Sequence, residues 1–317
     1  MRILVVGGTG FIGRHLVAKL VADGHVVIIP TRRYVHGRDL LPLPTVILVE
    51  ANVHEDGALN RLVQGCDAVI NLVGILHGRR GQPYGPDFKR AHVDLPARLA
   101  QACVRHGVRQ FLHVSALGAH AQAPSGYLRS KAAGEQAILD AYEQRNGTQG
   151  HSGYAIFRPS VVFGPDDQFM NLFARLAHML PVIFLAGAHS RLQPVYVGDV
   201  VKALVSVTYA DHAPNRSYAL VGPQVYTLAQ LVSLAARWSG SPRWVVPVPN
   251  ALGYAQALLL ECLPGEPLMS RDNLDSLKVD NVSNEPLPPE LGVIPTPLEA
   301  VAPRYLSRHT GQGAQQA

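Results

Sequence analysis

Residues 2–13 read RILVVGGTGFIG, and this stretch decides the fold. Arg2–Val6 is a short apolar run that predicts a buried strand, and a helical pattern follows the glycines. Gly7 permits a tight turn, Gly10 lets the backbone approach a pyrophosphate, and Gly13 allows the helix to pack closely on the strand. Amide groups at the helix N-terminus then face the anion. The stretch predicts a dinucleotide phosphate loop; the alternative is a glycine-rich turn without a ligand.

Short β-branched runs alternate with longer helical patterns over the first two thirds of the chain, which is typical of βαβ units. The runs are apolar on both faces, as expected where helices cover both sides of a parallel sheet. We therefore predict an α/β fold, a Rossmann-type doubly wound parallel sheet with a smaller C-terminal α/β lobe. The expected strands are Arg2–Val6, Val26–Thr31, Val46–Glu50, Ala68–Leu72, Gln110–Ser115 and Ala155–Arg158. The expected helices are Gly13–Asp23, Leu59–Gln64, Asp87–His106 and Gly126 to about Arg145.

The pattern changes after Pro159, where prolines and glycines become frequent. We assign residues 1–215 to the NAD(P)-binding Rossmann domain, with 166–190 contributing to the second lobe. Val195–Tyr209 is interpreted as a strand and helix that return to the main domain. Residues 216–306 form the smaller lobe, for substrate or partner, and the polar residues 307–317 are expected to be disordered.

Composition excludes several classes of function. The 28 basic and 23 acidic residues are interspersed, and the longest basic runs are the pairs Arg32-Arg33 and Arg79-Arg80. This is too thin for a nucleic-acid footprint. Three distant cysteines without a CxxC and histidines without ligand spacing predict no metal. No apolar run reaches the ~18 residues of a membrane span. We expect a soluble cytoplasmic protein.

The end of the second strand discriminates between the two nicotinamide dinucleotides. An acidic residue there holds the ribose hydroxyls of NAD, whereas a basic residue accommodates the 2′-phosphate of NADP. The strand ends Thr31-Arg32-Arg33, and the next acidic residue along the chain is Asp39. Arg32 or Arg33 can clamp a phosphate. NADP(H) is the preferred cofactor and NAD(H) the alternative, because the pair can also be an ordinary exposed one.

A candidate acid–base group follows the fifth strand. Tyr127 and Lys131 are four residues apart in a helical stretch, so they share a face. Ser115 closes the strand at the carboxyl edge, where ligands bind in such sheets. A lysine ammonium beside the phenol, with an oxidised nicotinamide, would favour the phenolate. Tyr127 can then exchange a proton with a substrate oxygen that Ser115 holds. A packing tyrosine and a surface lysine are the alternative.

These features together resemble the short-chain dehydrogenase/reductase superfamily, and its NAD-dependent epimerase/dehydratase group in particular. The resemblance rests on the GGTGFIG loop, the Ser115…Tyr127-x-x-x-Lys131 set, residues 158–165 (RPSVVFGP) and residues 195–200 (VYVGDV), and it covers roughly residues 1–240. Residues 71–76, 113–118, 127–135 and 163–171 are similar to the subgroup that contains the NAD(P)H-binding accessory subunit of mitochondrial complex I.

The resemblance implies cofactor contacts along the loop and at the ends of later strands. The implied contacts are Gly7, Thr9, Gly10, Phe11, Ile12, Gly13, Arg32, Asn52, Val53, Leu72, Gly74 and Lys131, to which we add Arg33, Val73, Pro159, Val161 and Val162. Two departures stand out. The loop between Ser115 and Tyr127 is shorter than in sugar-nucleotide epimerases, and His92 stands where the family often has Asn.

Two functions are therefore compatible with the sequence. The first is an NADP-dependent oxidoreductase or epimerase acting on a small or moderately apolar hydroxyl or carbonyl substrate. The second is a non-catalytic NADPH-binding protein that docks on a respiratory or membrane-associated complex, peripherally at the inner membrane. The apolar segments Leu172–Ala188 and Ala251–Leu263 support docking; core or homodimer surface is the plainer interpretation of both.

Overall fold

The computed structural model describes residues 1–144, 152–262 and 267–307. Its centre is a seven-stranded sheet with the spatial order β11-β6-β5-β4-β1-β2-β3, and all its strand pairs are parallel. The chain runs outward from β1 to β3, then crosses back to β4, so the strand order reverses between β1 and β4. The strands are β1 Arg2–Val6, β2 Val26–Thr31, β3 Val46–Glu50, β4 Ala68–Asn71, β5 Gln110–Val114, β6 Gly153–Pro159 and β11 Arg216–Leu220.

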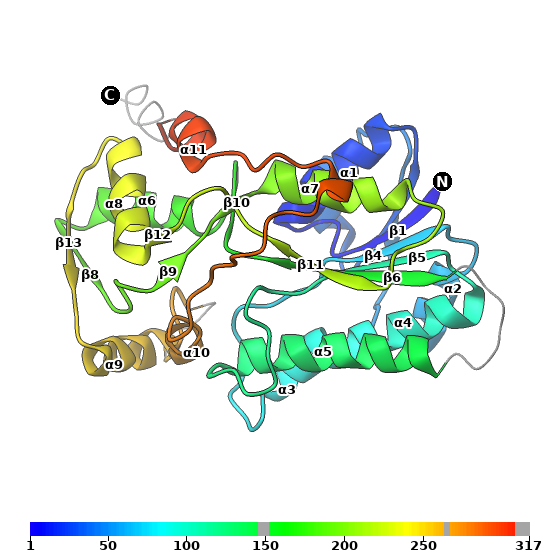
Figure 1. The fold of residues 1–317 in the computed structure, drawn as a ribbon, viewed down its shortest axis with the longest axis horizontal. Coiled ribbons are helices and arrows are strands. Elements are labelled where there is room, and N and C mark those ends of the chain that lie inside the picture. The colour runs from blue at the N-terminus through cyan, green and yellow to red at the C-terminus, as the bar shows by residue number, and fades with distance from the viewer. Residues whose placement is uncertain (145–151, 263–266, 308–317) are drawn as a thin grey trace.

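Alternate residues of each central strand enter two different hydrophobic clusters, because successive side chains point to opposite faces. Ile3 and Val5 pack with the helices on one face of the sheet, and Leu4 and Val6 with those on the other. The first face is covered by α1 Phe11–Ala22 and α7 Val197–Thr208, and the second by α2 Asp56–Val63, α4 Leu95–His106 and α5 Gly126–Glu143 (Figure 1). The predicted doubly wound α/β fold is confirmed.

The second lobe has a hydrophobic cluster of its own and lies at the other end of the molecule (Figure 1). Its helices are α6 Met170–Met179, α8 Leu228–Trp238, α9 Asn250–Glu261, α10 Arg271–Ser276 and α11 Leu298–Leu306. Short strand pairs complete it: β7 Val162–Phe163 with β10 Val195–Tyr196, β8 Val182–Leu185 with β13 Trp244–Pro247, and β9 Arg191–Leu192 with β12 Tyr226–Thr227. Thr227 and Gln230 form a capping box that starts α8.

Three expectations about elements need correction. β11, which we placed in the smaller lobe, pairs with β6 as the edge strand of the main sheet. Val195–Tyr196 does not return to that sheet and pairs with β7 instead. The single helix expected over Asp87–His106 is divided into α3 Pro86–Phe88, a π-helical turn Lys89–Asp94 and α4. Short 3-10 turns occur at Tyr34–Leu40 and Pro289–Leu291.

Some predictions fall outside the described residues. The helix end expected at Arg145, the end of the apolar segment at Leu263 and the tail beyond residue 307 belong to this group. Within the described ranges, no helix is both long and apolar enough to cross a membrane.

Candidate dinucleotide and acid–base site

The phosphate loop has the tight geometry that its glycines predict. Gly7 lies in the left-handed region with φ of +85°, and a Cβ on Gly13 would lie 2.5 Å from the Gly7 carbonyl oxygen. The turn is closed by the Gly10 amide, which donates to that oxygen at 3.0 Å. α1 begins at Phe11, and its N-cap Gly10 supplies no side-chain acceptor. The first amides of α1 are therefore available to bind an anion.

The loop lies against the end of β4, at the point where the strand order reverses. Val6 is in register with Asn71, and a Cβ on Gly7 would lie 3.1 Å from both the Leu72 carbonyl carbon and the Val73 nitrogen. The structure thus brings the predicted residues Leu72 and Val73 beside the loop, while Gly74 lies next to Lys131 and His92. Ligands bind at such a switch point in open α/β sheets, so this edge suits a dinucleotide.

The end of β2 carries an exposed basic pair. Thr31 donates its hydroxyl to the Arg33 carbonyl at 2.9 Å, and neither Arg32 nor Arg33 has an ion pair with a carboxylate of the described residues. Asp39, the first acidic residue after the basic pair, forms an ion pair with Arg14. In the sheet, however, Glu50 of β3 is in register with Thr31 and accepts from the Tyr34 amide at 3.1 Å. Sequence order alone missed this carboxylate.

The turn after β3 lies near the same basic pair. The Asn52 side chain accepts from the His54 amide at 3.1 Å and donates to Glu55 at 2.9 Å, which fixes the predicted contact residues Asn52 and Val53 after β3. Burial lowers the pKa of His54, and the charges of Arg90, Arg98 and Arg32 lower it further. Arg90 joins this basic cluster from the π-helical turn, where no sequence pattern distinguished it.

The acid–base candidates meet at the carboxyl edge of β4 and β5. The Lys131 ammonium is buried and donates to the Val114 carbonyl at 3.1 Å, and a Cβ on Gly74 would lie 3.3 Å from its nitrogen. The Ser115 hydroxyl is buried with no hydrogen-bond partner among the described residues. The Tyr127 hydroxyl also has no such partner, and its side chain is only partly buried. Two hydroxyls are thus left for a substrate oxygen.

His92 forms the wall behind Tyr127, and its two nitrogens are both used. Nε2 accepts from the Ile75 amide at 3.0 Å, while Nδ1 lies 2.8 Å from the Ser130 hydroxyl. Because that hydroxyl donates to the Tyr127 carbonyl at 2.7 Å, Nδ1 carries the proton. The ring is edge-on to Tyr127 at 5.5 Å. His92 is therefore a neutral positioning group beneath the helix that bears Tyr127.

The π-helical turn that carries His92 has a local cause. Pro96 has no amide hydrogen to donate to the His92 carbonyl four residues earlier, and its ring crowds that oxygen. The carbonyl faces Gly134 of α5, where a Cβ would lie only 1.8 Å from the oxygen. Gly134 thus lets α5 approach this turn closely, which brings Tyr127 and His92 together.

The second lobe caps the helix that carries Tyr127. Asp272 of α10 accepts from the amides of Gly126 and Tyr127 at 2.7 and 3.0 Å, and Ser125 accepts from Leu128 at 3.2 Å. The donors of the first turn of α5 are therefore paired. Asp272 lies 145 residues from Tyr127 in the chain, and no sequence pattern indicated this contact.

Burial sets the electrostatics of the acid–base candidates. Burial raises the pKa of Tyr127 to about 12, and the Asp272 carboxylate adds to the increase. Burial lowers the pKa of Lys131 to about 8, against the opposing effect of Glu135. Burial and the charge of Lys131 lower the pKa of His92 to about 2. In the chain by itself Tyr127 is thus a protonated phenol, and the phenolate expected beside Lys131 and an oxidised nicotinamide stays a prediction.

The remaining predicted contacts lie at the end of β6 and at the start of β7. Pro159 ends β6 and its carbonyl accepts from Leu117 at 2.9 Å, and the Val161 carbonyl accepts from Val195 at 2.9 Å. Val162 packs against the cluster on the α1 face. A Cβ on nearby Gly164 would lie 3.5 Å from the Phe11 ring, so β7 and the phosphate loop meet here. A nucleotide contact of Pro159, Val161 or Val162 stays a prediction.

The doubly wound sheet, the glycine loop at its switch point and the Ser115–Tyr127–Lys131 edge together define an NAD(P)-binding Rossmann-fold protein of the short-chain dehydrogenase type. The chain belongs to the NAD dependent epimerase/dehydratase family, whose model matches residues 3–220. The family resemblance predicted from the motifs is thereby confirmed.

Several relatives are similar over most of the chain. NADH dehydrogenase [ubiquinone] 1 alpha subcomplex subunit 9, mitochondrial, from Mus musculus is 34% identical over 314 residues, with 96% of this chain and 79% of the relative covered. Ceramide reductase from Caulobacter vibrioides is 29% identical over 252 residues, with 78% and 74% covered. A solved structure of MoeE5 with UDP-glucuronic acid and NAD has a TM-score of 0.73 at 18% identity and covers 99% of this chain and 100% of its own.

Proposed function

We propose that the protein is an NADP-dependent oxidoreductase or epimerase that acts on a hydroxyl or carbonyl group. The observation that carries this proposal is the pair of unpartnered hydroxyls, Ser115 and Tyr127, beside the buried Lys131 ammonium at the switch-point edge. A buried hydroxyl without a partner is costly. A substrate oxygen that accepts from the Ser115 hydroxyl would supply the missing partner.

The residues of the site have separate roles in this proposal. The bound nicotinamide would supply or accept the hydride. Ser115 would donate a hydrogen bond to the substrate oxygen. Tyr127, which is protonated because burial raises its pKa to about 12, would give that oxygen its proton during reduction. The α1 amides would hold the pyrophosphate, Arg32 and Arg33 the 2′-phosphate, and Lys131 the nicotinamide ribose.

A moderately apolar substrate is favoured over a nucleotide sugar. The relative named ceramide reductase supports a substrate with a long apolar part. The short connection between Ser115 and Tyr127 points the same way, because sugar-nucleotide epimerases usually have a longer one. Asp272 and Asn273 of α10 lie over this region, where Asn273 donates to the Leu76 carbonyl at 3.3 Å.

A non-catalytic, NADPH-binding docking protein is the second candidate. Its support is the similarity to the NADH dehydrogenase subunit over 96% of the chain. The raised pKa of Tyr127 is compatible with it, since a phenol that stays protonated is a poor base. Turnover of a bound nucleotide separates the two candidates.

Tyr127→Phe tests the catalytic role. Removal of the hydroxyl should lower kcat for reduction of a ketone-bearing lipid or small carbonyl by about 100-fold or more, while NADPH affinity, measured by fluorescence titration, stays unchanged. Tyr142→Phe on the far part of α5 is the matched control. Turnover that survives Tyr127→Phe undiminished would contradict the proposed role. Stoichiometric NADPH that no carbonyl substrate oxidises would favour the docking candidate.

A further inference from the structure

One end of the second lobe is apolar on its outer surface. α9 buries Gly253 and Ala257 against Ala186 and Leu274, and it exposes the opposite face. Leu252 and Leu259, seven residues apart and two turns along that face, are 61% and 71% exposed. The only charged residue in α9 is Glu261 at its end, which pairs with Arg271. The exposed face of α9 thus carries Leu252 and Leu259 with the uncharged Gln256 between them, and no charge before Glu261.

The neighbouring β8–β13 pair repeats this arrangement. Ile183 and Leu185 point into the lobe, whereas Phe184 between them is 59% exposed. Phe184 is in register with Val246 of β13, which is 38% exposed, and Trp244 two residues earlier is 81% exposed. We call the outward-facing residues Phe184, Trp244, Val246, Leu252 and Leu259 the apolar tip; α9 and β13 lie at the same end of the molecule (Figure 1).

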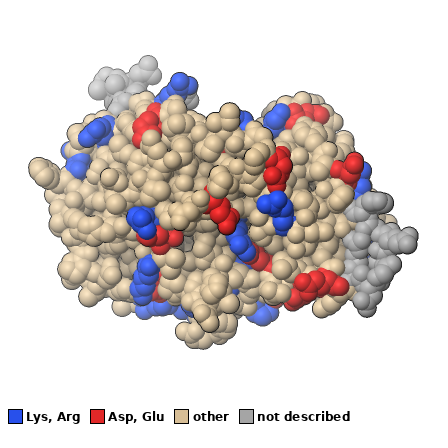
Figure 2. Space-filling view, in the orientation of Figure 1, with Lys and Arg blue, Asp and Glu red and all other residues tan. Residues whose placement is uncertain are grey.

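Basic side chains without acidic partners border the apolar tip. Arg237 and Arg243 form no ion pair with any described carboxylate. The same holds for Arg175 and Arg304 of this lobe, whereas Arg191, Arg271 and Lys278 are paired. Arg243 is held in place because its Nε donates to the carbonyls of Ala177 and Leu180 at 2.9 and 3.0 Å. At this end of the molecule Figure 2 shows uncharged and basic surface.

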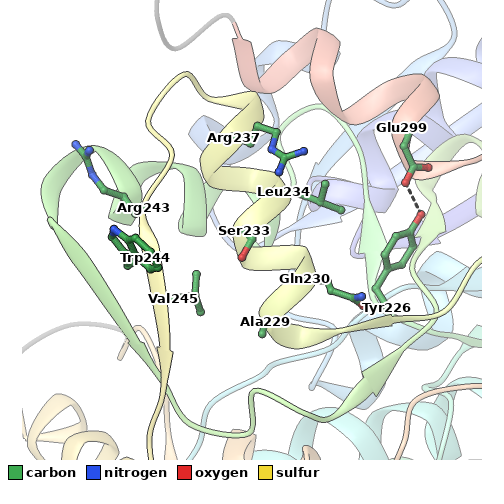
Figure 3. Close-up of a pocket in the computed structure, with 10 residues that line it drawn as sticks. All are labelled: Tyr226, Ala229, Gln230, Ser233, Leu234, Arg237, Arg243, Trp244, Val245 and Glu299. Atoms are coloured by element: carbon green, nitrogen blue, oxygen red, sulfur yellow. Dashed lines mark hydrogen bonds between the residues drawn. The ribbon is translucent and has the colours of Figure 1, made fainter.

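A groove of about 620 Å³ lies between α8 and β13, with both arginines and Trp244 at its sides (Figure 3). The one acidic group in its lining, Glu299, accepts from the Tyr226 hydroxyl at 2.7 Å and faces away from Arg243 (Figure 3). Gln230 and Ser233 add uncharged polar groups to the lining. The groove therefore offers positive charge and hydrogen-bond donors directly beside an exposed tryptophan.

We propose that the protein binds peripherally to anionic lipid bilayers through the apolar tip, with Arg237 and Arg243 on lipid phosphates at the groove. An exposed tryptophan beside apolar side chains and uncompensated arginines matches the chemistry of a bilayer interface, where the aromatic ring lies at headgroup depth. The inference does not depend on catalysis.

A second copy of the chain fits this surface less well. A two-fold interface centred on the tip would bring like surfaces together, and with them the arginines of both copies. Such like charges oppose association unless an acid lies between them. The elements that form the tip, β8, β13 and α9, contain no acid before Glu261, which is already paired. The charge pattern therefore favours a negatively charged surface over a copy of itself.

Vesicle binding by the Trp238→Phe variant tests the proposal directly. The chain has two tryptophans, so Trp244 is then the one that remains. The protein should cosediment with vesicles of phosphatidylcholine that contain a quarter phosphatidylglycerol, and its tryptophan emission should shift to the blue. Brominated lipid in the same vesicles should quench that emission. Pure phosphatidylcholine should bind at least tenfold more weakly. The absence of quenching, or equal binding to both compositions, would overturn the proposal.

Variants separate the two parts of the surface. Arg237→Gln with Arg243→Gln should weaken binding to the anionic vesicles about thirtyfold, and Trp244→Ser with Leu259→Ser at least tenfold. Ile294→Ser is the matched control, since Ile294 is 86% exposed in the segment that joins α7 through Thr296 and Asp199. NADPH affinity should be unchanged in all variants. A dimer in light scattering that Trp244→Ser dissociates would instead assign the tip to a copy of the chain.

Discussion

Arg32 and Glu50 oppose each other in the choice of nucleotide at the end of β2. Arg32 is exposed without an ion-pair partner, and Glu50 lies on the adjacent strand in register with Thr31. A guanidinium attracts a 2′-phosphate, whereas a carboxylate accepts from ribose hydroxyls. The Glu50 side chain already accepts from the Tyr34 amide, which directs it toward the 3-10 turn. The proposed preference for NADP rests on the balance between these two residues.

Arg32→Gln should therefore change selectivity rather than binding as a whole. We expect the affinity for NADPH to fall about tenfold or more, because a charge-assisted hydrogen bond is lost, and the affinity for NADH to stay within about twofold. Fluorescence titration with both nucleotides measures this, and Arg105→Gln on α4 is the control. Equal losses for both nucleotides would place Arg32 on the adenine instead of the phosphate.

The residues that the sequence predicted and those that it missed differ in one physical respect. The glycine loop and the Tyr127–Lys131 pair are set by spacings within one turn or one helix, so local periodicity was enough. Glu50 and Asp272 reach the site through sheet register and lobe packing, which no local pattern records. The π-helical turn was predictable in principle from Pro96, whose missing amide hydrogen interrupts the helix.

At the scale of elements, α5 is positioned from both of its sides. Gly134 lets it approach the π-helical turn, and Asp272 caps its first amides from the second lobe. The Asp272 carboxylate also adds to the increase in the pKa of the Tyr127 phenol. A helix N-terminus is stabilised by negative charge, so the same group that orders α5 also makes its tyrosine a weaker acid.

Asp272→Asn should lower the pKa of Tyr127 while it keeps one acceptor for the α5 amides. In the direction of alcohol oxidation, which needs the phenolate, the rising limb of the kcat–pH profile should therefore move to lower pH. Asp272→Ala should in addition cost about 1 kcal/mol of unfolding free energy through the lost cap. Asp140→Asn, at the other end of α5, is the control. An unmoved profile in Asp272→Asn would show that its charge does not reach Tyr127.

At the scale of the whole molecule, residues of the second lobe contact the loops and the helix at the carboxyl edge of the main sheet. Asn281 donates its side-chain amide to the Leu117 carbonyl at 3.1 Å and accepts from the Ser160 hydroxyl, so it joins the loops after β5 and β6. Asp272 fixes α5 in the same way. The relative position of Ser115 and Tyr127 thus depends on both lobes. A variant that loosens the contacts between the lobes should disturb this position even though it changes neither residue.

The interior of the molecule also contains neutral histidines that make the fold sensitive to acid. His92 and His113 are fully buried, and burial and Lys131 lower the pKa of each, that of His92 to about 2. The unfolded chain takes up these protons below pH ~6.5, whereas the folded chain does not. Stability is therefore fully present above about pH 6.5 and is lost as the pH falls below it.

His92→Asn should reduce this loss, because it removes one group that takes up a proton only on unfolding. Between pH 7 and 4.5 the decrease in unfolding free energy should be smaller in the variant by about 2 to 3 kcal/mol. Denaturant unfolding at the two pH values measures the difference, and the variant's own loss of stability at pH 7 cancels in it. His36→Asn, at an exposed position, should reproduce the decrease of the unmodified chain. Equal decreases in both variants would mean that His92 is already protonated in the folded state at pH 4.5, which would contradict the neutral ring inferred from its bonds to Ile75 and Ser130.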